Sequence, residues 1–173
     1  TGGWKDDLPD GYGKDYTKAT NVTREGTWKD GVFIDTKAVT SPPTTSNKCV
    51  SGNCVNGRGK MVYTNGDIYE GDFVRGKKQG KGTLTFKVGG VYIGQFSNDE
   101  RNGKGKMTFP DGEIYQGDFV NGELEGQGTM TWANGDVYIG KWKRNDYNGY
   151  GKEHIKATNI IREGTWKDGF FVD

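Results

Sequence analysis

The sequence has few of the residues that build a thick core, a metal centre or a membrane anchor. Only 31% of its 173 residues are hydrophobic and 30 are Gly, so a two-layered aliphatic core is not expected. One His and two Cys cannot supply the four ligands of a structural zinc site within one chain. No apolar run approaches the roughly 18 residues of a membrane-spanning helix, and residues 1–4 lack the features of a signal peptide. The sequence therefore predicts no metal and no cofactor.

The sequence also lacks an excess of charge of either sign. The chain carries 24 Lys and Arg against 23 Asp and Glu, a net charge of +1. Such a balance gives no general attraction to nucleic acid, which needs a strongly basic surface. We therefore expect no nucleic-acid partner, and any electrostatic recognition must be local.

A catalytic constellation is absent as well. His154 has no serine or cysteine within its own repeat, and the recurring carboxylates Asp72, Asp118 and Glu163 lie beside lysines, as in cross-strand ion pairing. The Gly-rich stretches belong to predicted strands and no helix follows them, so they do not match a phosphate-binding loop. The sequence predicts a protein that is not an enzyme.

The chain does contain a repeat of 23 residues. Two motifs, a glycine pair and a tyrosine motif, each recur at this spacing, and we call each series of copies a ladder. Two independent ladders over four periods identify a linear repeat array. The glycine pairs are Gly57/Gly59, Gly80/Gly82, Gly103/Gly105, Gly126/Gly128 and Gly149/Gly151, and the second ladder begins at Tyr69, Tyr92, Tyr115 and Tyr138, with a divergent copy at Arg162.

Within a repeat the side chains alternate with the period of a β-strand. The turn at residues 110–112 reads Pro-Asp-Gly, which suits a three-residue loop made of a type I turn and a glycine bulge. A loop of this length pairs Phe109 with Glu113 and places Gly105 opposite Gly117. Each repeat is then one hairpin, and the main array is an elongated, twisted, single-layer antiparallel sheet of about ten strands in an all-β fold.

Glycine and aromatic residues share one face of this sheet. A strand glycine leaves a slot on the pleat, across which an aromatic ring can lie in place of a second layer. The same rings could alternatively line a partly open groove for a partner helix or a glycan strand. The set comprises Tyr69, Phe73, Tyr92, Phe96, Tyr115, Phe119, Tyr138, Trp142 and Trp166.

Basic residues form a second candidate site, facing away from the rings or lying in a nearby loop. Together they could meet anionic phospholipid or phosphoinositide headgroups. Glu70, Asp72 and Asp118 share that face, so cross-strand neutralisation is the alternative. The candidates are Arg58, Lys60, Lys81, Lys104 and Lys106 on the strands, and Arg75, Lys77 and Lys78 in the loop.

The two ends of the chain are near copies of each other. Residues 4–35 align without a gap on residues 142–173, and we interpret each copy as a repeat that terminates an array. The expected organisation is a capping repeat of a preceding array at 1–35, a Ser/Thr/Pro linker at 36–48, and at 49–173 an array of about four full repeats plus a divergent C-terminal cap. The first cap could dock on the free edge of its own array or on another molecule.

Cys49 and Cys54 lie five residues apart, directly before the first complete repeat. They could close a small disulfide loop in an oxidising compartment, or remain as two free thiols at a turn. The linker and this pair favour a secreted or surface-exposed chain over a cytoplasmic one.

The tyrosine-x-gly-x-aromatic motif followed by gly-x-gly resembles the MORN repeat, the membrane occupation and recognition nexus motif. The resemblance covers residues 55–152, extends through Asp173 as a divergent repeat and recurs in residues 11–35. The paired cysteines are similar to those that precede such arrays in some bacterial proteins. The family implies a sheet of successive hairpins that binds or scaffolds.

We therefore expect a non-enzymatic module for protein–protein interaction. Peripheral binding to anionic phospholipid is the second hypothesis, and glycan or cell-wall binding through exposed aromatics is the third. Because an open sheet leaves unpaired edges, a homodimer is also expected.

Overall fold

The computed structural model describes residues 2–5, 8–17, 22–29, 32–33 and 46–172, and up to residue 45 it describes only the backbone of the strands. The described residues form strands and turns, with no helix. The chain divides into two compact units, Thr1–Thr45 and Ser46–Asp173. Most of the predicted linker lies within residues 34–45, which are outside the described residues. The predicted docking of the first cap is likewise outside what the structure describes.

The first unit is a four-stranded antiparallel sheet. Its order is β1 (Gly2–Lys5), β2 (Leu8–Thr17), β3 (Val22–Lys29) and β4 (Val32–Phe33). Gly13 pairs with Gly26 in this sheet, as Gly151 pairs with Gly164 in the second unit. The two copies found in the sequence thus share one strand register.

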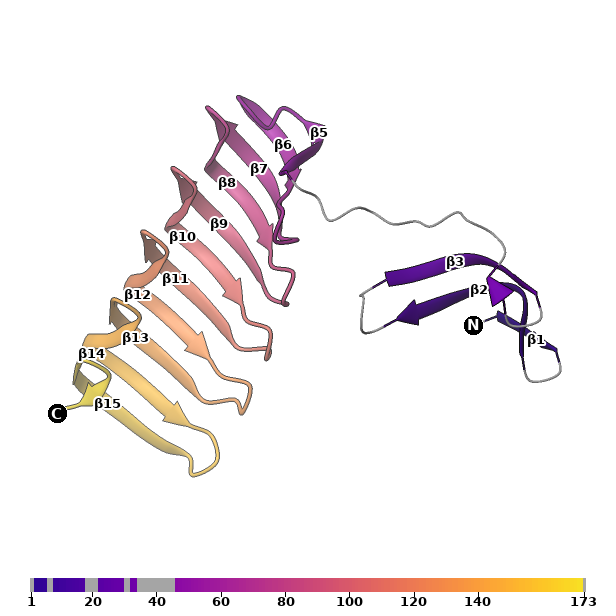
Figure 1. The fold of residues 1–173 in the computed structure, drawn as a ribbon. Helices are drawn as coiled ribbons and strands as arrows, with labels where there is room; N and C mark the ends of the chain where they lie inside the picture. Colours follow the sequence, from indigo (N-terminus) through magenta and orange to yellow (C-terminus); the bar gives the residue numbers. More distant parts are fainter. Residues whose placement is uncertain (1, 6–7, 18–21, 30–31, 34–45, 173) are drawn as a thin grey trace. The chain divides into compact units, whose positions relative to one another are not determined.

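The second unit is one open antiparallel sheet of twelve strands in which every strand pairs with its neighbours in sequence. Figure 1 shows the hairpins in a row, with turns along both edges and a curl of the strands near one edge. The expectation of about ten strands was too low because β5 and the two-residue β16 flank the repeats. The strands are β5 (Lys48–Gly52), β6 (Gly57–Val62), β7 (Ile68–Val74), β8 (Lys77–Thr85), β9 (Val91–Ser97), β10 (Glu100–Thr108), β11 (Ile114–Val120), β12 (Glu123–Thr131), β13 (Val137–Lys143), β14 (Asp146–Ile155), β15 (Ile160–Lys167) and β16 (Phe170–Phe171).

The turn between β10 and β11 has the predicted geometry. Phe109 N donates to Glu113 O at 2.8 Å, and Gly112 N donates to Phe109 O at 3.0 Å. Gly112 has a φ of 92°, the left-handed conformation that a glycine bulge requires. Gly105 consequently lies opposite Gly117. The predicted fold, an all-β sheet of successive antiparallel hairpins, is confirmed.

The strands bend sharply toward the aromatic face. Tyr115 and Phe119 lie four residues apart on β11, which would separate them by about 13 Å on a straight strand, yet their ring centroids are 5.1 Å apart. The bend coincides with a register shift between β11 and β12, after Gly117 pairs with Gly128. There Asp118 Oδ2 accepts a hydrogen bond from Gln127 N at 3.0 Å, so the irregular backbone is stabilised by a side chain.

The bend encloses the core, which is a continuous row of aromatic rings. Each tyrosine meets the aromatic residue of the next hairpin edge to face, as in Tyr92–Phe119 at 5.0 Å and Tyr115–Trp142 at 5.3 Å. Each tyrosine hydroxyl also donates to a backbone oxygen three residues ahead, for example to Asp118 O at 3.0 Å. Folding the sheet over its own rings therefore supplies the burial that a second layer supplies elsewhere.

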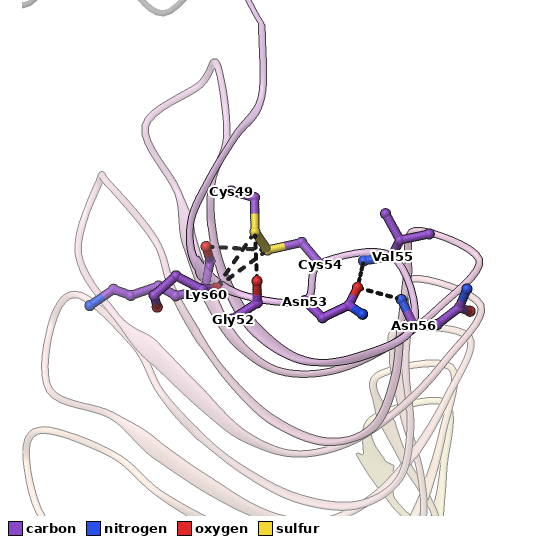
Figure 2. The surroundings of a disulfide bond; sticks show 8 residues. Cys49, Gly52, Asn53, Cys54, Val55, Asn56 and Lys60 are labelled. Carbon is purple, nitrogen blue, oxygen red and sulfur yellow. Dashed lines mark hydrogen bonds between the residues drawn. A yellow bond between two sulfur atoms is a disulfide. The ribbon is translucent and has the colours of Figure 1, made fainter.

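Different groups close the two ends of this core. At the start, the structure joins Cys49 and Cys54 in a disulfide with Cα atoms 5.9 Å apart (Figure 2). Cys54 is 5% exposed, and a Cβ atom on Gly59 would lie 2.8 Å from its sulfur. The sulfur thus covers a strand glycine as the tyrosine rings do in later repeats. At the other end Trp166 packs against Phe171 with centroids 5.1 Å apart.

Candidate binding surface

The nine aromatic residues singled out in the sequence lie inside the bent sheet, where they hold it together. All of them are between 0% and 4% exposed. Burial raises the pKa of Tyr92 to about 12 and, with the nearby Glu153, that of Tyr138 to about 12. The bent sheet encloses these rings, so a partner does not reach them.

A column of side chains at the 23-residue spacing covers the rings from the curled side of the sheet. It consists of Lys78, Arg101, Leu124 and Tyr147. Arg101 lies 5.5 Å from the Phe119 ring centroid and donates to Gly122 O at 2.6 Å. Burial lowers the pKa of its guanidinium. The sequence interpretation missed this column, although counting back in steps of two from each glycine pair leads to it.

Lys78 therefore has a different position from the one expected. We placed Lys77 and Lys78 in a loop, but both belong to β8, and only Arg75 lies in the turn that precedes it. The Lys78 side chain is 14% exposed, forms an ion pair with Asp99 at 3.5 Å and lies 4.9 Å from the Tyr63 ring centroid. It covers the aromatic core and lines a hollow on that side of the sheet.

One hollow opens on the aromatic side, between the curl and the turns. It has a volume of about 390 Å³, and its lining includes Leu84, Phe86, Met107 and Arg101. It lies on the face for which the sequence predicts a partly open groove.

The opposite side of the sheet, which we call the outer face, carries most of the predicted basic site. Arg58, Lys81, Lys104 and Lys106 are exposed there, and Lys60 is partly exposed. Carboxylates neutralise part of this charge, with Lys104 at 2.7 Å from Asp118 and Lys60 at 3.8 Å from Glu70. Cross-strand neutralisation is therefore real but incomplete, since no described ion pair includes Lys81 or Lys106.

Three hollows lie on the outer face, and each shares lining residues with the next. The first, of about 270 Å³, shares Arg58 and Thr83 with the second, of about 510 Å³. The second shares Ile93 and Lys104 with the third, of about 660 Å³, which ends at Ile139. We call this chain of hollows, from β6 to β13, the trough.

The trough has walls of side chains and a floor of backbone. Gly105, Gly117 and Gly128 line the third hollow between Lys104 and Gln127 on one side and Ile93, Lys106, Gln116, Thr129 and Ile139 on the other. A Cβ at each of these glycines would point toward a tyrosine, so these positions present only backbone to the outer face.

Arg75 and Lys77 do not contribute to these hollows. Both are exposed, in the turn before β8 and at its first residue. Of the eight predicted basic residues, the structure brings five together along the trough, namely Arg58, Lys60, Lys81, Lys104 and Lys106.

The described residues include no group of His, Cys, Asp or Glu side chains arranged to hold a metal ion. Nor does the described part of the chain include a helix with the length and apolar character to cross a bilayer.

A comparison with the curated proteins found no match. Among solved structures, the chain is similar to the Drosophila melanogaster SAS-4 (dCPAP) TCP domain, solved in complex with a proline-rich motif of Ana2 (dSTIL). The identity is 17% and the TM-score 0.34, over 63% of this chain and 72% of that one.

The family model for the MORN repeat matches six segments, residues 1–14, 56–68, 69–91, 92–114, 115–137 and 138–156. The four segments from 69 to 156 each contain one hairpin of the second unit, the segment 56–68 contains β6, and the first covers β1 and part of β2. MORN repeats are binding or scaffolding modules. This chain belongs to the MORN repeat family.

Proposed function

We propose that this chain is a protein-binding module whose trough holds a segment of an acidic partner protein. The observation that supports this most directly is the continuity of the three hollows, which share Arg58, Thr83, Ile93 and Lys104. A single linear ligand can occupy them in succession. The role is non-enzymatic, since binding along a rigid repeat surface needs no reacting group.

The chemistry of the trough favours protein over membrane. Ile93 and Ile139 are 57% and 55% exposed, and they flank the amides of Gln116 and Gln127. Apolar side chains beside amides and lysines suit a polypeptide, which presents apolar groups, peptide groups and carboxylates together. Glu70 and Asp118 on the same face would repel a uniformly anionic surface.

Anionic phospholipid remains the second candidate because of one hollow. Arg58, Lys81 and Lys104 all line the hollow of about 510 Å³, and convergent cations are what a phosphate group requires. The glycan alternative depended on exposed rings, and we do not carry it forward because the predicted rings are buried.

Selection of a displayed library of 12-residue peptides on the full chain tests the proposal. Selected peptides are titrated by fluorescence anisotropy against the wild type and a Lys81→Glu/Lys106→Glu variant. The matched control is Lys143→Glu/Lys167→Glu, which reverses two exposed lysines outside the hollows. We expect at least a ~10-fold weaker Kd in the trough variant and an unchanged Kd in the control.

Two outcomes would contradict the proposal. Selected peptides could bind the trough variant as tightly as the wild type, which would place their site elsewhere. Alternatively, vesicles of phosphatidylcholine and phosphatidylserine could bind the chain at 0.15 M salt while no peptide does, which would favour the lipid candidate. The predicted homodimer is checked separately by sedimentation equilibrium.

A further inference from the structure

We infer that the partner segment lies in the trough as an extended strand, with two apolar side chains six residues apart and, between them, an acidic residue two positions from the apolar residue that meets Ile93. This inference rests on the proposed function and specifies its ligand. It follows from the width of the trough, from the distance between its two apolar anchors and from the position of its uncompensated charge.

The width of the trough selects the backbone conformation. Its two walls come from positions two residues apart on each strand, such as Lys104 and Lys106 on β10, with Gly105 between them. Two residues of strand span about 7 Å. A helix with its side chains is about 10–12 Å across, so it would rest on the rims and leave the glycine floor uncovered. A single extended chain fits between the walls.

The spacing of the anchors sets the length of the recognised segment. Ile93 lies on β9 and Ile139 on β13, and both line the third hollow. Four strand intervals of about 4.8 Å place them ~19 Å apart, and an extended chain covers that distance in about six residues at ~3.3 Å each. Because six is even, both apolar side chains of the ligand point to the same side, toward the sheet.

The sequence explains why the anchors are so far apart. The positions equivalent to Ile93 one repeat before and one repeat after are Glu70 and Gln116. The isoleucine returns only at Ile139, two repeats on. The two apolar contacts are therefore two repeats apart, and a shorter spacing in the ligand would place an apolar side chain against the amide of Gln116.

The charge of the trough makes its two ends different. Lys106 is the cross-strand partner of Ile93, and no described ion pair includes it. Lys104 beside it is 2.7 Å from Asp118. Toward Ile139 the third hollow is lined by Gln127 and Thr129. An acidic residue two positions from the apolar residue that meets Ile93 lies about 7 Å along the trough, within reach of Lys106.

Three fluorescein-labelled peptides of one length test the inference by anisotropy on the full chain. The first has leucines six residues apart and an aspartate two positions after the first leucine. The second has the same composition with leucines four residues apart, and the third is the first with Asn for Asp. We expect the first peptide to bind at least ~10-fold more tightly than either of the others.

Substitutions in the protein complete the test. Ile93→Thr and Ile139→Thr should each weaken the first peptide ~10-fold. The matched control Ile161→Thr, at an exposed isoleucine on β15 outside the hollows, should leave its Kd unchanged. Equal affinity for the first two peptides, or insensitivity to both trough substitutions, would overturn the inference.

Failure of the inference and failure of the proposed function give different results. If the three peptides bind alike but all lose affinity in Lys81→Glu/Lys106→Glu, the trough binds acidic protein without the predicted spacing. If neither they nor any library-selected peptide respond to that charge reversal, the proposed function fails with the inference.

Discussion

The ring of Tyr115 lies over Gly117, which follows it by two residues on the same strand. A Cβ atom on Gly117 would overlap the phenol and would also stand 2.6 Å from both Gln127 O and Gly128 Cα. The same relationship recurs between Tyr69 and Gly71, Tyr92 and Gly94, and Tyr138 and Gly140. Strand glycine, which usually weakens a sheet, is here a condition for burying the tyrosine.

We predict that Gly117→Ala destabilises the array by about 3 kcal/mol, because the new methyl group meets backbone that cannot move aside. Urea denaturation followed by tryptophan fluorescence measures the change. Gln116→Ala, at the exposed neighbouring position, is the control and should change the stability by less than about 0.5 kcal/mol. Equal effects of the two substitutions would show that the ring does not depend on the bare glycine.

The column that covers the rings leads to a second prediction. Arg101→Ala removes a side chain that packs on Phe119 and bonds Gly122 O at 2.6 Å, so we expect a loss of about 2 kcal/mol. Arg101→Leu should recover at least half of it, because the equivalent residue of the next repeat is Leu124, 7% exposed. Thermal denaturation by circular dichroism compares the variants. If Leu is no better than Ala, Arg101 contributes through its charge and its hydrogen bond to Gly122 O, and not through its packing on the rings.

Alkaline pH should unfold the array. Burial raises the pKa of Tyr63 and Tyr92 from the ordinary tyrosine value of 10.0 to about 12. Since the unfolded state then loses these protons more readily, stability is fully present below pH 10 and falls as the pH rises toward 12. Ultraviolet absorbance of tyrosinate, recorded with circular dichroism, checks this. Ionisation of the core tyrosines near pH 10 without unfolding would contradict the enclosed core.

The disulfide should act locally. Cys54 covers Gly59 where a later repeat has a tyrosine ring, so reduction should loosen β5 and β6 at the edge of the sheet. Closing so short a loop contributes about 2 kcal/mol. Hydrogen exchange should show faster amide exchange in β5 and β6 after reduction and no change in β12 to β14. A uniform increase over the whole sheet would mean that the array unfolds as one unit.

The alternation of side chains along each strand, taken with the turn length, predicted most of the fold. Three-residue turns place Gly105 opposite Gly117 and Met107 opposite Tyr115, as the structure has them. What that reading left undecided was the extent of the strands beyond each glycine pair. Lys78 was assigned to a loop, whereas β8 begins at Lys77, because a strand start with two lysines has no apolar pattern to reveal it.

The candidate site was predictable only in part. Alternation placed Arg58, Lys81, Lys104 and Lys106 on one face, and the structure agrees. The alternation did not predict that hollows on that face connect from β6 to β13. Nor did it predict that Ile93 and Ile139 line one of these hollows. Hollows depend on the curvature and twist of the whole sheet, to which neighbouring strands contribute together.

The sequence by itself determined the hairpins, their register and the shared face of glycine and tyrosine, because turn length and strand alternation are local properties. Only the tertiary structure decided that the pairs β7–β8, β9–β10, β11–β12 and β13–β14 each carry a register shift, such as that between Gly117 and Asp118, where the strands bend. That bend brings the ring centroids of Tyr115 and Phe119 to 5.1 Å, encloses the rings and leaves the trough on the opposite surface. Its physical cause is the burial of aromatic area across several hairpins at once, which no single repeat can achieve alone.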